Sequence, residues 1–297
     1  MKNLINYLYN IDITSIKDFN GYYYIKDDKS NYLLIKYNDS KNFHYIYQKC
    51  QILNMNTFFT YQVRLNIYGT FISTIEGNKY VLLDIKRNYS DEVDLIDMID
   101  FHNRSSSIIR NEINYQCNWD LLWESKIDYL HSHILDNKLN NKKQIIFLYY
   151  YLGVAENALI YIRNIKNILI STKYDKVCFA HRRIFIPNIK MNFNNPFNLL
   201  IDLDIRDIAE YIKCLYLNDG DYLNELEYYL KTNSISNYTA SLLYARIVYP
   251  SYFFDYYENS SSYYSKKFYE VNEYEEFIKK TYDLIKSYVP IDKISWL

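Results

Sequence analysis

The residues best suited to chemistry lie in one short segment, from His181 to Asn188, and at Asp202, which ends an apolar run. In a phosphotransferase loop, an aspartate two residues after a histidine accepts the proton of the attacking hydroxyl, and an asparagine five residues later binds magnesium. His181, Arg182 and Asn188 fit this spacing, but Arg183 stands where the aspartate would be. Asp202 follows where a second carboxylate would bind the metal. The pattern predicts Asn188 and Asp202 as metal and cofactor ligands, beside a degenerate catalytic loop of His181, Arg182 and Arg183.

Arg183 cannot act as a general base. A guanidinium has five N–H donors, no acceptor and a pKa above about 12, so it stays charged. A general base typically contributes about 10²–10⁴-fold to the rate. The fixed positive charge would also repel a magnesium ion held by Asn188 and Asp202, although it would attract a phosphate oxygen. The substitution therefore predicts impaired phosphoryl transfer and leaves anion binding open.

Lys36 is a second candidate cofactor ligand, because it ends the apolar run 33–35 immediately before an expected helix. In an ATP-binding lobe such a lysine pairs with the phosphates and is held by an acidic residue of the next helix. Here the helix carries no Asp or Glu between 41 and 55. The turn at 20–21 has one glycine followed by three tyrosines, unlike a glycine-rich phosphate loop. Lys36 is therefore either a phosphate-pairing residue or the polar end of an edge strand.

The elements that must position these residues change in character along the chain. Up to about residue 84, runs of Tyr, Ile and Leu separated by turn-forming residues predict an antiparallel sheet with one inserted helix. The expected strands are 22–25, 32–37, 62–68, 70–75 and 80–85, and the expected helix spans 42–55. From Ser90 onward the apolar residues recur at helical spacing.

The second part of the chain is predicted to be mainly helical. Its expected helices are 119–135, 143–170, 205–217, 223–231, 238–249 and 274–288, and its expected strands are 177–181 and 197–202. Asp207 should cap the helix from 205 or anchor the catalytic loop. The predicted fold class is therefore α+β, with a small β-rich lobe, residues 1–87, and a larger mainly α lobe, residues 88–297. The crossing has no Pro or Gly, so we expect the lobes to pack together.

Composition narrows the function classes. A formal net charge of -1 removes the electrostatic argument for a nucleic-acid or anionic-membrane partner. The four cysteines lie far apart without a C-x-x-C pair, so neither a zinc site nor a disulfide framework is predicted. The N-terminus lacks a signal-type apolar core, and the apolar run 145–155 is too short to span a bilayer. We expect a cytoplasmic protein without nucleic-acid or membrane partners.

Tyrosine is abundant, with 37 residues in 297, including local clusters at 22–24, 149–151 and 256–257. We interpret this mainly as a bias toward AT-rich codons, because amphipathic aromatic residues are common at core edges. A tyrosine-rich surface for cross-linking or partner binding remains a second interpretation.

Several segments of the large lobe resemble the aminoglycoside-phosphotransferase and choline-kinase superfamily, and within it the spore-coat kinase-like family of endospore-forming bacteria. They are LGVAENA at 152–158, the His181 segment, FNLLID at 197–202, RDIAEYI at 206–212 and ARIVYPSYFFD at 245–255. The small lobe matches in layout alone. The resemblance implies a two-lobed protein-kinase-like fold, spore coat proteins as partners and the spore coat of the mother cell compartment as a location. It implies an uncertain or absent phosphotransfer activity and supplies no substrate.

Three functions are compatible with these residues. The first is a pseudokinase that needs no cofactor and has a structural or interaction role in spore coat assembly. The second is an active small-molecule phosphotransferase that uses ATP and Mg with an atypical catalytic loop. The third is a regulatory module that captures a phosphorylated or acidic ligand on Arg182, Arg183 and Lys190, unless Arg182 instead pairs with a buried carboxylate of the large lobe.

Overall fold

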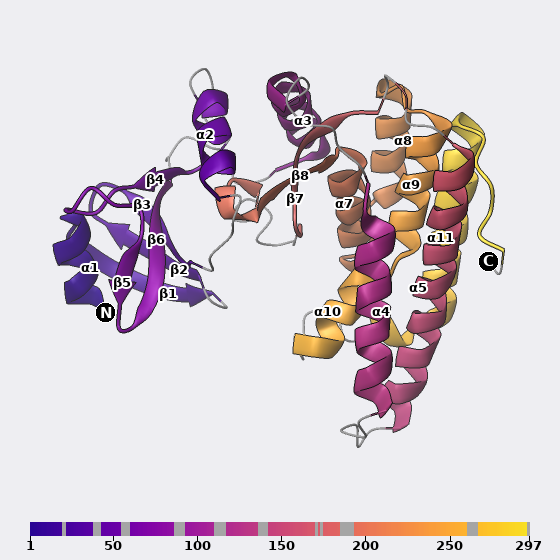
Figure 1. Ribbon diagram of the computed structural model, residues 1–297, viewed down its shortest axis with the longest axis horizontal. Helices are drawn as coiled ribbons and strands as arrows, with labels where there is room; N and C mark the ends of the chain where they lie inside the picture. Colours follow the sequence, from indigo (N-terminus) through magenta and orange to yellow (C-terminus); the bar gives the residue numbers. More distant parts are fainter. Residues whose placement is uncertain are drawn as a thin grey trace. The chain divides into compact units, whose positions relative to one another are not determined.

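The computed structural model of the chain divides into two compact units (Figure 1). The first comprises Met1–Val93 and Ile189–Leu199, and the second comprises Asp94–Asn188 and Leu200–Leu297. The structure describes residues 1–19, 22–37, 43–54, 60–85, 93–109, 117–135, 142–169, 172, 175–184, 193–259 and 267–295.

The first unit includes a segment that the predicted lobe boundary at residue 87 gave to the other lobe. The amide of Tyr61 donates to the carbonyl oxygen of Asn194 at 2.8 Å. The ring of Phe197 packs edge-on against Tyr37, with centroids 6.1 Å apart. These contacts join the segment around 194–197 to the sheet of the first unit, although the two lie far apart in the sequence.

The sheet of the first unit is antiparallel, with strand order β1-β2-β3-β6-β4 and β5 paired to β6. Its elements are α1 (Lys2–Tyr9), β1 (Ile13–Phe19), β2 (Tyr22–Asp27), β3 (Asn31–Lys36), α2 (Phe43–Asn54), β4 (Gln62–Arg64), β5 (Ser73–Ile75), β6 (Asn78–Ile85) and the short η1 (Pro196–Asn198). The antiparallel sheet and its inserted helix are as predicted, but β4 and β5 are shorter than the expected strands 62–68 and 70–75, and both pair with β6. The edge strand β1 was missed, because Lys17 and Asp18 interrupt its apolar pattern.

The two faces of this sheet have different cores, because side chains alternate along each strand. One face carries Ile25, Leu34 and Leu82, which pack with Ile5 and Leu8 of α1. The other face is packed with aromatic and aliphatic residues, including Tyr47 of α2. The residues of this second cluster are Leu33, Ile35, Tyr37, Tyr61, Val63, Val81 and Leu83, with Tyr22, Tyr47, Phe71, Ile72, Ile85 and Phe197 packed against them. The helices α1 and α2 thus lie on different sides of the sheet (Figure 1).

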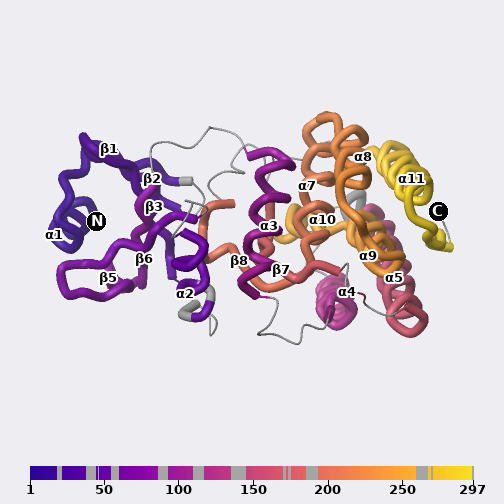
Figure 2. Tube along the Cα trace, turned by 90° about the horizontal axis from the view of Figure 1, so that it is seen from above, coloured from indigo at the N-terminus to yellow at the C-terminus, as the bar shows by residue number. Residues whose placement is uncertain are grey.

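The second unit is mainly helical, and Figure 2 shows its longer helices side by side. Its elements are α3 (Leu95–Ile109), α4 (Trp119–Leu135), α5 (Lys142–Ile168), β7 (Val177–His181), β8 (Leu199–Leu203), α7 (Ile205–Leu217), α8 (Tyr222–Thr232), α9 (Asn237–Val248), α10 (Ser251–Asn259), η3 (Lys267–Tyr269) and α11 (Val271–Tyr288). The predicted helices and the two predicted strands, β7 and β8, are confirmed, and the two strands pair with each other. Every residue of α9 except Asn237 is buried, so α9 forms the centre of this unit's core.

The helix α5 has about the predicted length, and its apolar stretch extends beyond the run 145–155 noted in the sequence. By length and composition, residues 145–168 could cross a membrane, with a mean hydropathy of 1.5. Half of this stretch is buried within the second unit, where α5 packs against α4 and α9. Such packing is typical of a core helix in a soluble domain. The absence of a membrane partner stays a prediction.

Candidate functional site

The end of β7 is anchored by a buried carboxylate of α7. Asp207 accepts a hydrogen bond from the amide of His181 at 2.7 Å, and its Oδ2 lies 2.5 Å from His181 Nδ1 and 2.9 Å from His102 Nε2. The three side chains are at most 1% exposed. Burial would raise the pKa of Asp207, but the two histidines hold it below its usual range. Asp207 therefore anchors the degenerate loop, and the cap of α7 is Asp204 instead, whose side chain accepts from the amide of Ile205.

Arg183 is bound by a carboxylate of α10. Its Nε donates to Asp255 Oδ2 at 2.6 Å and its Nη2 donates to Asp255 Oδ1 at 3.3 Å. Burial alone would lower the pKa of the guanidinium, but Asp255 and Glu210 raise it above its usual value. The two side chains remain 31% and 27% exposed, so the ion pair lies at the edge of solvent. The position of the missing base thus holds a paired, permanently charged cation.

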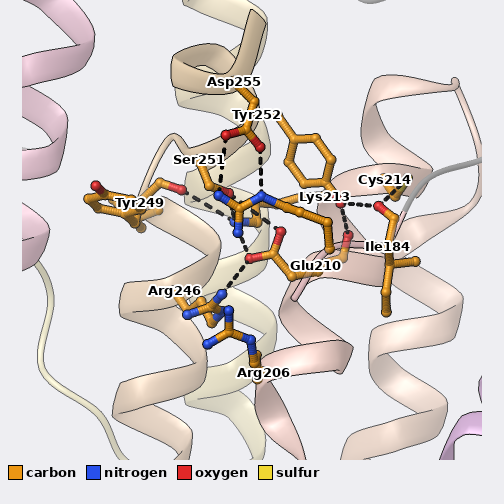
Figure 3. A network of polar contacts seen from close by, with 12 residues as sticks. Ile184, Arg206, Glu210, Lys213, Cys214, Arg246, Tyr249, Ser251, Tyr252 and Asp255 are labelled. Atoms are coloured by element: carbon orange, nitrogen blue, oxygen red, sulfur yellow. Dashed lines mark hydrogen bonds and ion pairs between the residues drawn. The ribbon is translucent and has the colours of Figure 1, made fainter. Parts of the chain in front are cut away.

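The chain that leaves Arg183 is held by the same helix. The hydroxyl of Tyr252 donates to the carbonyl oxygens of Ile184 and Glu210, at 2.5 Å and 3.2 Å. The thiol of Cys214 contacts the Ile184 oxygen from α7 at 3.5 Å. These bonds fix the backbone next to Arg183 between α7 and α10 (Figure 3).

A buried network of charges lies beside this ion pair, with Glu210 between Lys213 and Arg246 (Figure 3). Glu210 Oε1 accepts from Lys213 Nζ at 3.1 Å and from Arg246 Nη2 at 2.9 Å. Burial opposes ionisation of Glu210, but Lys213 and the neighbouring arginines lower its pKa to about 2. Burial lowers the pKa of Lys213 to about 8, although its Nζ also donates to Ser251 Oγ at 2.7 Å and to the Tyr249 oxygen at 3.3 Å.

Asp202, the predicted metal ligand, is already bound by groups of its own chain. Its Oδ2 accepts from Trp119 Nε1 at 2.8 Å and from Arg206 Nη1 at 2.7 Å, and its Oδ1 accepts from the amide of Leu203 at 2.8 Å. The residue is 4% exposed. Within the described ranges, no group of three or more His, Cys, Asp or Glu side chains is arranged to hold a metal ion. Asn188 lies outside the described residues. Asn188 and Asp202 as metal ligands therefore stay a prediction, and Asp202 is engaged by groups of its own chain.

Lys36 lies on the face of the sheet that carries α1. Across the ladder it pairs with Tyr80 of β6, and both Tyr80 and Leu34 belong to the cluster beneath α1. Leu33 and Ile35 point to the opposite face, where Tyr47 of α2 packs. The Lys36 side chain is exposed. The strand pattern predicted the alternation but could not show which set of side chains would face α2.

Arg182 does not form the buried ion pair that was one of its two interpretations, and its part in binding an acidic ligand stays a prediction. Its side chain is exposed, so it forms no buried ion pair of the large lobe. Among the described residues, the buried arginines are Arg206, paired with Asp202, and Arg246, which stacks over the ring of Trp119 at 4.5 Å. Lys190 lies outside the described residues.

Sequence reasoning missed the partner of Arg183. Asp255 ends the ARIVYPSYFFD segment, whose members also contact Glu210 and Lys213, but it lies 72 residues from Arg183 and no spacing rule joins the two. Charged residues are dense in RDIAEYI, but ARIVYPSYFFD carries Arg246 and Asp255 alone, so no local signal marked Asp255 as the partner.

A small antiparallel sheet with an inserted helix, together with a mainly helical unit and a loop anchored after β7, defines a protein-kinase-like α+β fold. The chain belongs to the family described as "Spore coat putative kinase YutH", whose model matches residues 2–290. It is 25% identical over 263 residues, 75% of each chain, to the endospore coat-associated protein YutH of Bacillus subtilis (strain 168).

Solved structures confirm the predicted fold class. Spectinomycin phosphotransferase APH(9)-Ia, in its AMP-bound complex, has a TM-score of 0.57 at 10% identity, over 95% of this chain and 96% of that one. Choline kinase LicA from Streptococcus pneumoniae has a TM-score of 0.53 at 11% identity, over 95% and 97% of the two chains. At these identities the likeness concerns the fold alone.

Proposed function

We propose that this chain is a catalytically impaired kinase-like protein, a pseudokinase, with a structural or interaction role in spore coat assembly. The observation that carries the first part is the pairing of Arg183 with Asp255. A guanidinium offers no lone pair to a substrate hydroxyl, and its two bonds to a carboxylate keep it protonated at every physiological pH. The coat role rests on family membership and on the coat-associated relative.

Neighbouring side chains hold Arg183 in place at the position of the catalytic aspartate. Asp255 supplies the opposite charge, and Tyr252, three residues earlier on the same helix, holds the backbone of Ile184. Asp202, the residue expected to bind the metal, is bound by Trp119 and Arg206. Arg183, at the position of the general base, and Asp202, the predicted metal ligand, are therefore both engaged in ion pairs or hydrogen bonds within the chain.

The two other functions have weaker support. An active ATP-dependent phosphotransferase would have to free Asp202 from Arg206 before a metal could bind, and would need a base other than Arg183. A module that captures phosphate would have to displace Asp255 from Arg183. Binding of ATP and Mg by Lys36, Asn188 and Asp202 is therefore proposed only for the alternative, an active phosphotransferase.

Thermal unfolding with and without ATP and Mg tests this proposal. The matched variant is the charge swap Arg183→Asp with Asp255→Arg, which restores an aspartate to the loop and keeps an ion pair. A ligand at 100 times its Kd stabilises a protein by about 2.7 kcal/mol, which gives a clear rise in Tm. We expect no nucleotide-dependent rise for the natural chain. A rise for the natural chain that Asp202→Asn removes would favour the active enzyme.

The coat role has its own test in a spore-forming host. The chain should be found in the coat fraction of purified spores, and the charge-swap variant should be found there in equal amount, because assembly on a surface does not require phosphoryl transfer. Absence of the natural chain from the coat fraction would contradict the coat role and leave the pseudokinase assignment standing.

A further inference from the structure

One side of α5 carries large apolar residues in contact with solvent. Ile146, Tyr149 and Ile160 are 67%, 52% and 57% exposed. They belong to a row of exposed and partly exposed positions that are alternately three and four residues apart, at 146, 149, 153, 156, 160, 163 and 167. These seven positions form the α5 face. Their spacing is that by which a helix lines one side for a second helix packed along it.

Two side chains of opposite charge lie on either side of the centre of the α5 face. Glu156 and Arg163 are about two helical turns apart, with Ile160 between them. Each is held by a residue of α4, which packs beside α5 (Figure 1). His131 Nε2 lies 2.9 Å from Glu156 Oε1, and Arg163 Nη2 lies 2.7 Å from Glu124 Oε1. The four side chains are between 42% and 49% exposed, so both charges still face solvent.

The order of these charges makes the α5 face complementary to a second copy of itself. A two-fold axis joins the same patch of two chains, so each contact occurs twice. If the axis passes beside Ile160 and the two α5 helices are antiparallel, Glu156 of each chain lies opposite Arg163 of the other. The two Ile160 side chains then meet at the centre. A parallel pair would instead place like charges together, which opposes association.

The α5 face also has room for a second helix. No described atom lies within 4 Å of the place that a Cβ of Gly153 would occupy. In the antiparallel pair, Gly153 of one chain lies opposite the exposed Asn167 of the other, because both are seven residues from Ile160. The charges of Glu156 and Arg163 argue against lipid as the occupant, since charged side chains rarely face the bilayer interior.

We propose that this chain forms a two-fold symmetric dimer through the α5 face, with the two α5 helices antiparallel about Ile160. Burial of the apolar side chains drives association, and the Glu156–Arg163 pairs set the antiparallel register. Exposed apolar surface of this kind is typical of an interaction site. Neither Arg183 nor its partner Asp255 belongs to the α5 face, so the dimer is independent of the proposed loss of kinase chemistry.

Sedimentation equilibrium of the full chain measures this association. We expect the mass to approach twice the 36.1 kDa of one chain as the concentration rises. Ile160→Glu should raise the dimer Kd by at least about tenfold, because it places two carboxylates together at the axis. An unaltered Tm shows that the variant is folded. The proposal is wrong if the natural chain stays monomeric at every concentration, or if Ile160→Glu dimerises as tightly as the natural chain.

Exchange of charges tests the antiparallel register. Glu156→Arg and Arg163→Glu should each weaken self-association, because like charges then meet at both symmetry-related positions. An equimolar mixture of the two variants should form a heterodimer, since a face with two arginines then meets a face with two glutamates. The control Glu276→Arg alters a glutamate of α11 that is 62% exposed and should leave the Kd unchanged. Failure of the mixed variants to associate, or equal weakening by Glu276→Arg, would overturn the proposal.

An engineered disulfide tests the position of the axis. The four native cysteines are buried, and a residue at a two-fold axis lies next to its own copy. Ile160→Cys should therefore give a disulfide-linked dimer under mild oxidation. The matched control is Ile96→Cys on α3, because Ile96 is 58% exposed and Ile160 is 57% exposed. We expect the control to stay largely unlinked, and equal rates of linking in the two variants would contradict an axis at Ile160.

Discussion

Arg183 and Asp255 form a forked ion pair across 72 residues of sequence, with Nε–Oδ2 and Nη2–Oδ1 distances of 2.6 Å and 3.3 Å. An arginine at the position of a catalytic base would be an uncompensated charge if it stood alone. Here its charge is balanced by α10, and Tyr252 of the same helix holds the following backbone. Arg183 is therefore held in the second unit by its contacts with α10.

Asp255→Asn should lower the free energy of unfolding by about 1–2 kcal/mol, because Arg183 loses a charged partner at a partly exposed site. Urea unfolding measures this change. The control is Glu227→Gln, which removes the exposed pair with Lys231 and should leave stability almost unchanged. Equal effects of the two substitutions would show that Asp255 contributes no more than a surface pair. The charge swap of Arg183 and Asp255 should recover part of the lost stability.

Asp207→Asn should be the more damaging substitution, at about 3–5 kcal/mol, because it leaves two buried histidines without their shared carboxylate. The exposed carboxylate Asp100, paired with Arg104 on α3, provides the control, since Asp100→Asn should have little effect. A similar Tm for the two variants would contradict the anchoring role of Asp207.

Acid should destabilise the protein in part through Glu210. Its pKa in the folded protein, about 2, lies below the ordinary glutamate pKa of 4.5, so its contribution is complete above about pH 5 and is lost as the pH falls toward 2. The shift corresponds to about 3 kcal/mol at most. Unfolding measured from pH 7 to pH 2 should show a shallower acid loss in Glu210→Gln than in the natural chain. The exposed substitution Asp283→Asn should keep the natural slope, and an unchanged slope in Glu210→Gln would refute this prediction.

Lys36→Ala should leave stability almost unchanged, because the side chain is exposed and lies on the α1 face of the sheet. If the charge-swap variant of Arg183 and Asp255 binds ATP, Lys36→Ala in that background should bind it equally well. Calorimetric titration measures this. Loss of binding would restore Lys36 as a phosphate-pairing residue.

The sequence predicted most of the architecture because its signals are local. Helical spacing located α7 and α9, and strand alternation located β3 and β6, since apolar periodicity follows from which side of an element is buried. Strand alternation does not show which face of the sheet α1 covers, so it could not place Lys36 on that face. The bonds from Trp119 and Arg206 to Asp202, and from Asp255 to Arg183, join distant segments, so they could be found only from the folded chain.

Transfer or hydrolysis of the γ-phosphate of labelled ATP by the purified chain tests the loss of kinase chemistry most directly. The matched control is Asp202→Asn, which removes the expected metal ligand with little change of shape, with its folding verified by Tm. We predict that the natural chain and Asp202→Asn release phosphate at the same background rate. Turnover by the natural chain clearly above that of Asp202→Asn would contradict the assignment as a pseudokinase.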